Sequence, residues 1–105
     1  GAEPPSVAEL EQQGGADTLA LLRLLERDGE VVQVESERYY SSRALSALVG
    51  TLRATMQPGR PYTPAELRDA LGLSRKYLIP LLEYCDRSGI TDRRGGERFI
   101  APVQG

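Results

Sequence analysis

Residues 72–84, GLSRKYLIPLLEY, carry the strongest structural signal in this chain. Ser74 is a favourable N-cap residue, because its hydroxyl can accept a hydrogen bond from a first-turn N–H group. Apolar side chains follow at helical spacing: Leu78, Leu81, Leu82 and Cys85. The pattern predicts a helix with one buried face and an exposed basic first turn at Arg75 and Lys76. A helix start carries a partial positive charge and outward-pointing N–H groups, so this turn is a candidate phosphate-binding site.

The chain contains two copies of one sequence pattern. Three pairs of segments correspond: SVAEL at 6–10 with TPAEL at 63–67, LLRLLERDG at 21–29 with LLEYCDRSG at 81–89, and ERYY at 37–40 with ERFI at 97–100. The segment between the first two matched blocks differs in length. Such a period indicates one supersecondary unit used twice in tandem.

The second copy reads as helix, turn, helix and β-hairpin. TPAE at 63–66 is a capping box with proline at the first helical position, which predicts a short helix to about Leu71. A second helix is expected to begin after Ser74 and to stop near Gly89. A hairpin should follow, because two short segments flank the two-residue turn signal Gly95-Gly96. The expected strands are residues 90–94 and 97–100.

The first copy repeats this order. Its expected features are a capping box at Ser6 and Glu9, an N-cap at Asp17, a helix end at Gly29, and a hairpin between residues 31–34 and 38–40. One further helix, beginning at Ser41 or Ser42, is expected between the copies and ends before Pro58-Gly59. Its apolar face is Leu45, Leu48, Val49, Leu52 and Met56.

Three helices followed by a β-hairpin, the wing, make a winged helix, in which the third helix and the wing usually face nucleic acid. The helix between the copies is then the first helix of the second unit. The first unit lacks its own first helix, which we expect to precede Gly1 in a longer protein. We therefore predict an α+β, mainly α fold of tandem winged-helix units. An acidic partial unit is expected at residues 1–40 and a complete basic unit at residues 41–105.

Composition excludes most enzymatic chemistry. The 105 residues include no histidine and one cysteine, so His-based catalysis, most zinc sites and an internal disulfide are excluded. Cys85 lies on the expected inward face of its helix and is interpreted as a core residue. The sequence has no phosphate-binding loop, signal peptide or apolar run long enough to span a membrane. We expect a non-catalytic cytoplasmic module without a cofactor.

The net charge of −2 is unevenly distributed. Up to Gln57 there are nine acidic and five basic residues, whereas from Pro58 onward there are six acidic and eight basic residues. The two copies also differ where a nucleic acid would bind: the expected recognition-helix starts are DTLA at 17–20 and SRKY at 74–77, and the wing tips are ESE at 35–37 and RRGGER at 93–98. The first unit should repel phosphate and the second should attract it.

These residues also carry a family resemblance. Residues 71–99, LGLSRKYLIPLLEYCDRSGITDRRGGERF, resemble the last winged-helix domain of bacterial selenocysteine-specific translation elongation factors (SelB). Residues 3–10 and 24–29 are similar to the domain before it. The resemblance implies binding of the selenocysteine insertion hairpin in mRNA, and contact with the ribosome through the whole factor. In that family the GTPase and the selenocysteyl-tRNA site belong to other domains, so no enzymatic activity is implied here.

Seven residues of the second unit are predicted to contact RNA: Ser74, Arg75, Lys76, Tyr77, Arg93, Arg94 and Arg98. Lys76, Arg93 and Arg94 are assigned to phosphates. Double-stranded RNA hides its bases in a deep major groove, so specificity is expected from unpaired nucleotides. Arg75 and Tyr77 are assigned to an unpaired base, because they are expected nearer the helix axis, where such a base could stack or bond. Arg98 recurs as Arg38 in the acidic copy, so a structural role is an equal alternative. The interior residue Pro80 is expected to bend the helix near its basic end.

Two other functions stay open at this point. One is a regulator that binds duplex DNA, although no dimerisation segment is evident and operator recognition commonly uses symmetric pairs. The other is a protein–protein scaffold that docks a partner through the acidic first unit. We predict a monomer that binds an mRNA hairpin and no membrane. A gel-shift comparing an RNA hairpin with a DNA duplex would separate these functions.

Overall fold

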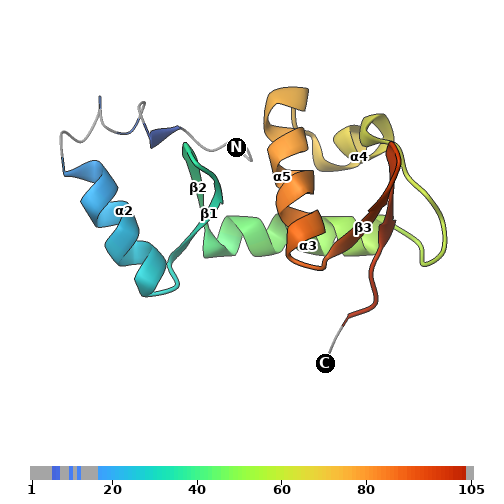
Figure 1. The fold of residues 1–105 in the computed structure, drawn as a ribbon, viewed down its shortest axis with the longest axis horizontal. Coiled ribbons are helices and arrows are strands. Elements are labelled where there is room, and N and C mark those ends of the chain that lie inside the picture. The colour runs from blue at the N-terminus through green and yellow to red at the C-terminus, as the bar shows by residue number, and fades with distance from the viewer. Residues whose placement is uncertain (1–5, 8–9, 11, 13–16, 104–105) are drawn as a thin grey trace. The chain divides into compact units, whose positions relative to one another are not determined.

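The computed structural model describes residues 6–7, 10, 12 and 17–103. The chain divides into two compact units, Gly1–Ser46 and Ala47–Gly105, and the boundary lies inside a helix. The described helices and strands are α2 (Thr18–Arg27), β1 (Val31–Glu35), β2 (Arg38–Ser41), α3 (Ser42–Thr55), α4 (Pro64–Leu71), α5 (Arg75–Arg87), β3 (Thr91–Arg94) and β4 (Glu97–Ile100) (Figure 1). This content confirms the α+β, mainly α class.

The start and end of α4 follow the local sequence as predicted. The Thr63 hydroxyl accepts from the Glu66 N–H at 3.3 Å, and the Glu66 carboxylate accepts from the Thr63 N–H at 3.1 Å. These two bonds form the capping box. Gly72 ends the helix in the left-handed region, at φ 69°, and donates its N–H to the Arg68 carbonyl. Glycine adopts this conformation without steric cost, so α4 stops here.

Helix α5 has the predicted buried face but not the predicted cap. Ser74 occupies the N-cap position, yet its side chain makes no capping hydrogen bond. Its backbone is extended, at ψ 159°, as at a capped helix start, and its carbonyl accepts from the Tyr77 N–H at 3.0 Å. The helix is assigned without interruption from Arg75 to Arg87 through Pro80. Whether Pro80 bends it stays a prediction.

The core of the second unit is formed by one face each of α3, α4 and α5. Its most deeply buried side chains include Leu52, Leu67, Leu78, Leu81, Leu82 and Cys85. Burial raises the pKa of the Cys85 thiol to about 11, with a further contribution from the neighbouring Asp86 carboxylate. The thiol is therefore neutral at physiological pH, which supports its interpretation as a core residue.

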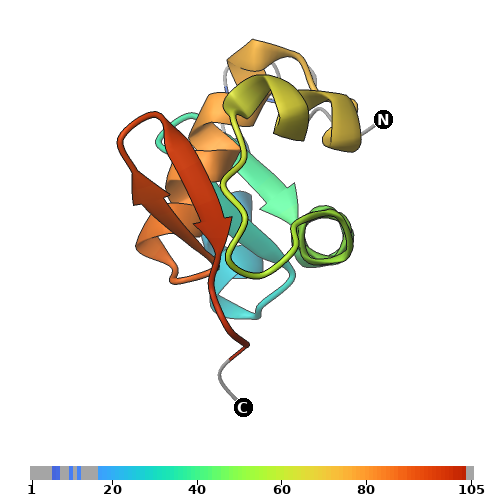
Figure 2. The ribbon, with the colours of Figure 1, turned by 90° about the vertical axis from the view of Figure 1, so that its right-hand side faces the viewer.

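The wing of the second unit is the β3–β4 hairpin, which packs against α5 (Figures 1 and 2). Its turn is Gly95-Gly96, as predicted, and Gly95 has a positive φ of 64°. Tyr62 extends the hairpin by an isolated antiparallel bridge to Arg98, in which each backbone N–H donates to the other residue's carbonyl at 2.9 Å. The wing is thereby attached to the segment that precedes α4.

The first unit repeats the helix and the hairpin on a smaller core. Val7, Leu22 and Tyr39 form its buried cluster. Helix α2 ends before Gly29, which has a φ of 78°, and β1 pairs with β2 as expected. The β1–β2 ladder contains a register shift between Gln33 and Glu35 that the wing of the second unit lacks.

One expected cap of the first unit is not formed, and another lies outside the described residues. Asp17 precedes α2, but its side chain makes no capping bond. Its backbone, at ψ 2°, is not in the extended conformation that directs a capping side chain toward the first-turn N–H groups. The capping box expected at Ser6 and Glu9 lies outside the described residues, which do not include Glu9.

Candidate nucleic-acid interface

The first turn of α5 presents two exposed cations and an aromatic ring. No acidic residue lies in this turn, and Ser74, Arg75 and Lys76 are exposed. The Lys76 Nζ atom lies 5.5 Å from the centroid of the Tyr77 ring, a cation–π distance. Among the described residues, none pairs with the Arg75 guanidinium by a hydrogen bond or an ion pair. The positive charge of this turn is therefore available to an external anion.

The two arginines of the β3 strand lie on opposite faces of the wing. Residues directly opposite each other in an antiparallel ladder share a face, and neighbours along a strand alternate. Arg93 is paired with Arg98, whereas Arg94 is paired with Glu97. Thr91 and Arg98 are buried and both bond to Asp86 of α5. The face that carries Arg93 is therefore the one that meets α5.

Arg98 is held inside the unit by an ion pair. Its Nε and Nη2 atoms donate to the Asp86 carboxylate at 3.0 and 2.8 Å, and the Thr91 hydroxyl donates to the same carboxylate at 2.7 Å. The Arg98 side chain is 3% exposed. A buried guanidinium whose Nε and Nη2 donate to a neighbouring carboxylate is not accessible to a phosphate. Of the two interpretations of Arg98, the geometry favours the structural one, and we leave it out of the proposed interface.

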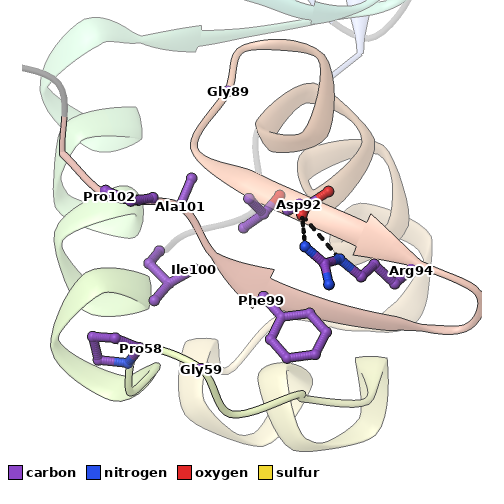
Figure 3. A pocket seen from close by; sticks show the side chains of 10 residues that line it. Pro58, Gly59, Gly89, Asp92, Arg94, Phe99, Ile100, Ala101 and Pro102 are labelled. Carbon is purple, nitrogen blue, oxygen red and sulfur yellow. Dashed lines mark hydrogen bonds and ion pairs between the residues drawn. The ribbon is translucent and has the colours of Figure 1, made fainter.

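Arg94 lies on the outer face of the wing, beside an open cavity of about 700 Å³ (Figure 3). Its Nε and Nη2 atoms donate to one oxygen of Asp92 at 3.1 and 3.0 Å, and its guanidinium lies 5.1 Å from the centroid of the Phe99 ring. Arg93 differs, because its Nε donates to the Gly95 carbonyl at 3.2 Å and no carboxylate of the described residues pairs with it. Within the described part of the chain, the charge of Arg94 is therefore partly neutralised and that of Arg93 is not. Arg93 is therefore a better candidate for phosphate contact than Arg94.

The N-terminal end of α5 and the turn of the wing lie toward the same end of the second unit in both views (Figures 1 and 2). This arrangement follows from the fold, since α5 leads directly into β3 and the hairpin returns alongside it. A ligand at this end can contact both elements at once. The sequence-predicted cations on α5 and the cation Arg93 thus belong to one candidate surface.

A cluster of contacts around Tyr62 connects the end of α3 with the start of α4. The Tyr62 hydroxyl accepts from the Gln57 N–H at 2.7 Å and donates to the Thr55 carbonyl at 3.2 Å. Arg60 lies 4.4 Å above the Tyr62 ring and pairs with Glu66 at 3.0 Å. The bond from Gln57, followed by the bond from Arg60, lowers the pKa of Tyr62. The cluster links the end of α3 to the start of α4.

One basic residue near the surface was not singled out from the sequence. Arg68 of α4 and Arg75 of α5 line the same small hollow. A signal was present, because continuing the alignment of the two copies places Arg68 opposite Glu11, another exchange of a negative for a positive charge. In the described part of the chain, no three potential metal-ligating side chains cluster, and no helix has the length and apolarity to span a membrane.

Comparisons with known proteins place this chain in a family. Residues 55–100 match the family model described as elongation factor SelB, winged helix. The structure of the mRNA-binding domain of SelB from E. coli, in complex with SECIS RNA, superposes on 97% of this chain and 87% of that chain, with a TM-score of 0.83 and 32% sequence identity. This chain belongs to the SelB family.

Full-length relatives support the same assignment. The SelB of Desulfomicrobium baculatum is 36% identical over 92% of this chain, and that of Escherichia coli K12 is 33% identical over 95%. A crystal structure of a bacterial selenocysteine-specific elongation factor superposes on 95% of the chain, with a TM-score of 0.80 at 28% identity. The chain spans about one sixth of the length of these relatives, 16% and 17% of the two SelB sequences. The match falls on the winged-helix, mRNA-binding part of SelB.

Proposed function

We propose that this chain is the mRNA-binding part of a selenocysteine-specific elongation factor, and that it binds an mRNA hairpin of the SECIS type. The observation that carries the proposal is its similarity, over nearly the whole chain, to a SelB domain whose structure contains SECIS RNA. The exposed basic first turn of α5 supports it independently. Through the rest of such a factor the chain would act at the ribosome, in the cytoplasm, as a monomer without a cofactor.

The second unit is the proposed reader and the first is a spacer. The first unit, Gly1–Ser46, has nine acidic and four basic residues, whereas the second, Ala47–Gly105, has six acidic and nine basic residues. Phosphates release counterions when they meet cations and are repelled by carboxylates, so binding energy should concentrate in the second unit. The proposed reader corresponds to the basic unit that the sequence repeat predicts at residues 41–105.

Within the reader, phosphate positioning and base reading are assigned to different side chains. Lys76 and Arg93 would hold phosphates that flank the hairpin loop, with the Ser74 hydroxyl as a further donor. The half-buried Tyr77 ring would stack on an unpaired base, since every base offers a π-face to an aromatic side chain. Arg94 would contribute less, because Asp92 already occupies two of its donors.

A binding titration tests this function. The SECIS RNA hairpin, the same hairpin with one loop base changed, and a DNA duplex of equal length would each be titrated with the chain. We expect tight binding of the first, with a loss of about 1–3 kcal/mol on changing a base that is read. Preference for the duplex would favour the DNA-binding alternative. No binding to any nucleic acid would overturn the proposal and leave the protein-scaffold alternative.

A further inference from the structure

Two arginines from different helices converge on one hollow in the second unit. Pro64, Ala65 and Arg68 of α4 line it on one side, and Arg75 and Leu78 of α5 line it on the other. Its volume is about 40 Å³. A water-sized group needs roughly 10–15 Å³ of such space, so an oxygen atom of a phosphate fits the hollow.

The hollow carries an excess of positive charge. Arg75 has no hydrogen-bonded or ion-paired partner among the described residues. The Nε of Arg68 lies 4.0 Å from the carboxylate of Asp69, at the outer limit of an ion pair, and the Asp69 side chain is 82% exposed. Water screens such a carboxylate strongly, so it does little to neutralise Arg68. Two cationic side chains that border one small hollow would both be attracted to an anion placed between them.

We propose that Arg68 and Arg75 together form a seat for one phosphate group of the bound RNA. The seat rests on the proposed RNA-binding function and adds a residue, Arg68, to its interface. It also revises the role of Arg75, which the sequence assigned to base reading. Guanidinium groups match phosphate through two parallel N–H donors, and the partial positive charge at the start of α5 adds to their attraction.

The two arginines act on the same phosphate, which makes the proposal distinct from general basicity. If one phosphodiester occupies the seat, removing either cation should release it, and removing both should cost little more. If each arginine contacts its own phosphate, the two losses should add. The dependence of log affinity on log salt falls by about 0.7–0.9 for each phosphate contact that is lost, so it distinguishes one phosphate from two.

The experiment titrates the SECIS RNA hairpin with the whole chain at several salt concentrations. The variants are Arg68→Gln, Arg75→Gln, their double mutant, and the control Arg53→Gln. Arg53 is an exposed cation that borders a hollow with Ser88 and Gly89, next to the opposite end of α5. We expect each single variant at the seat to bind about tenfold more weakly, the double variant to bind about as weakly as either, and Arg53→Gln to bind like the wild type.

A second arm locates the phosphate on the RNA. Each loop phosphate is replaced in turn by an uncharged methylphosphonate. At one position the wild type should lose affinity while Arg68→Gln loses none. Binding of Arg68→Gln equal to that of Arg53→Gln would overturn the seat and leave the RNA-binding function standing, and so would additive losses with a doubled change in salt dependence. Failure of the wild type to bind the hairpin would overturn both.

Discussion

The two units share their internal architecture but differ in the charge of their surfaces. Both place a helix against a two-stranded hairpin, end that helix before a glycine of positive φ, and bury the arginine of a common ERxx segment, Arg38 or Arg98. The exposed first turn and wing tip are acidic or neutral in the first unit and basic in the second. The two copies are therefore alike in the residues that pack their cores. They differ at the surface positions where RNA contacts are proposed.

The shared arginines also show how similar sequence can take different registers. Arg98 is opposite Arg93, one pair away from the wing turn, and its side chain reaches Asp86 on α5. Arg38 is opposite Glu35, next to its turn, and their side chains lie 3.8 Å apart. The register shift in the β1–β2 ladder moves the pairing by one residue. The second unit has an ion pair between helix and wing, and in the first unit the corresponding arginine has an ion pair within its hairpin.

The largest expected effect comes from breaking the ion pair between Asp86 and Arg98. Arg98→Ala should lower the free energy of unfolding of the second unit by about 3 kcal/mol, because it leaves a largely buried carboxylate without its partner. Arg38→Ala should cost less, about 1–2 kcal/mol, since Glu35 is one-third exposed and the contact is longer.

Urea unfolding would measure this difference, with Cys85 as a probe of the second unit alone. The buried Cys85 thiol, with a pKa of about 11, should react with an alkylating reagent only when that unit opens. Equal losses for the two variants would contradict the different roles of the two arginines. Unchanged stability of Arg98→Ala with lost RNA binding would return Arg98 to the interface.

A smaller effect is expected on RNA affinity when basic residues of α5 and of the two faces of the wing are replaced. Lys76→Ala and Arg93→Ala should each weaken SECIS hairpin binding about fivefold and lower its salt dependence by roughly 0.7–0.9, whereas Arg94→Ala should weaken it about twofold. Arg27→Ala in the first unit is the matched control and should change nothing. Fluorescence anisotropy at several salt concentrations measures all four variants. A larger loss for Arg94→Ala than for Arg93→Ala would contradict the assignment of the faces.

The substitution Pro80→Ala gives α5 the residue that α2 has at the aligned position, Ala20. Pro80→Ala restores a backbone donor to the Lys76 carbonyl and should raise the stability of the second unit by about 1 kcal/mol. If the proline shapes the basic end of α5, RNA affinity should fall about threefold at the same time. Thermal unfolding and hairpin titration of the same sample test both effects. Unchanged affinity would show that the proline has no part in presenting Arg75 and Lys76.

The features that local sequence determines were predictable. The capping box at Thr63, the Gly95-Gly96 turn and the buried face of α5 depend on residues a few positions apart, and all three are confirmed. The side-chain caps at Asp17 and Ser74 were not formed. At Asp17 the backbone is not extended, a condition that residue type alone does not determine.

The arrangement of the arginines was harder to predict, because it depends on contacts between elements. The burial of Arg98 requires Asp86, which lies on another element, and the hollow at Arg68 requires the packing of α4 against α5. The opposite orientation of Arg93 and Arg94 was accessible from the sequence, since consecutive strand residues point to opposite faces. Treating the two as one patch neglected that alternation.

The measurement that tests the central claim most directly is the affinity of the second unit alone for the SECIS hairpin. Residues 42–105 begin at the first residue of α3 and retain every proposed contact. Because the first unit is acidic, we predict that this fragment binds within a few-fold of the whole chain at the same salt concentration. Circular dichroism would establish that the fragment is folded. Loss of binding by the folded fragment would contradict the claim that the second unit reads the RNA.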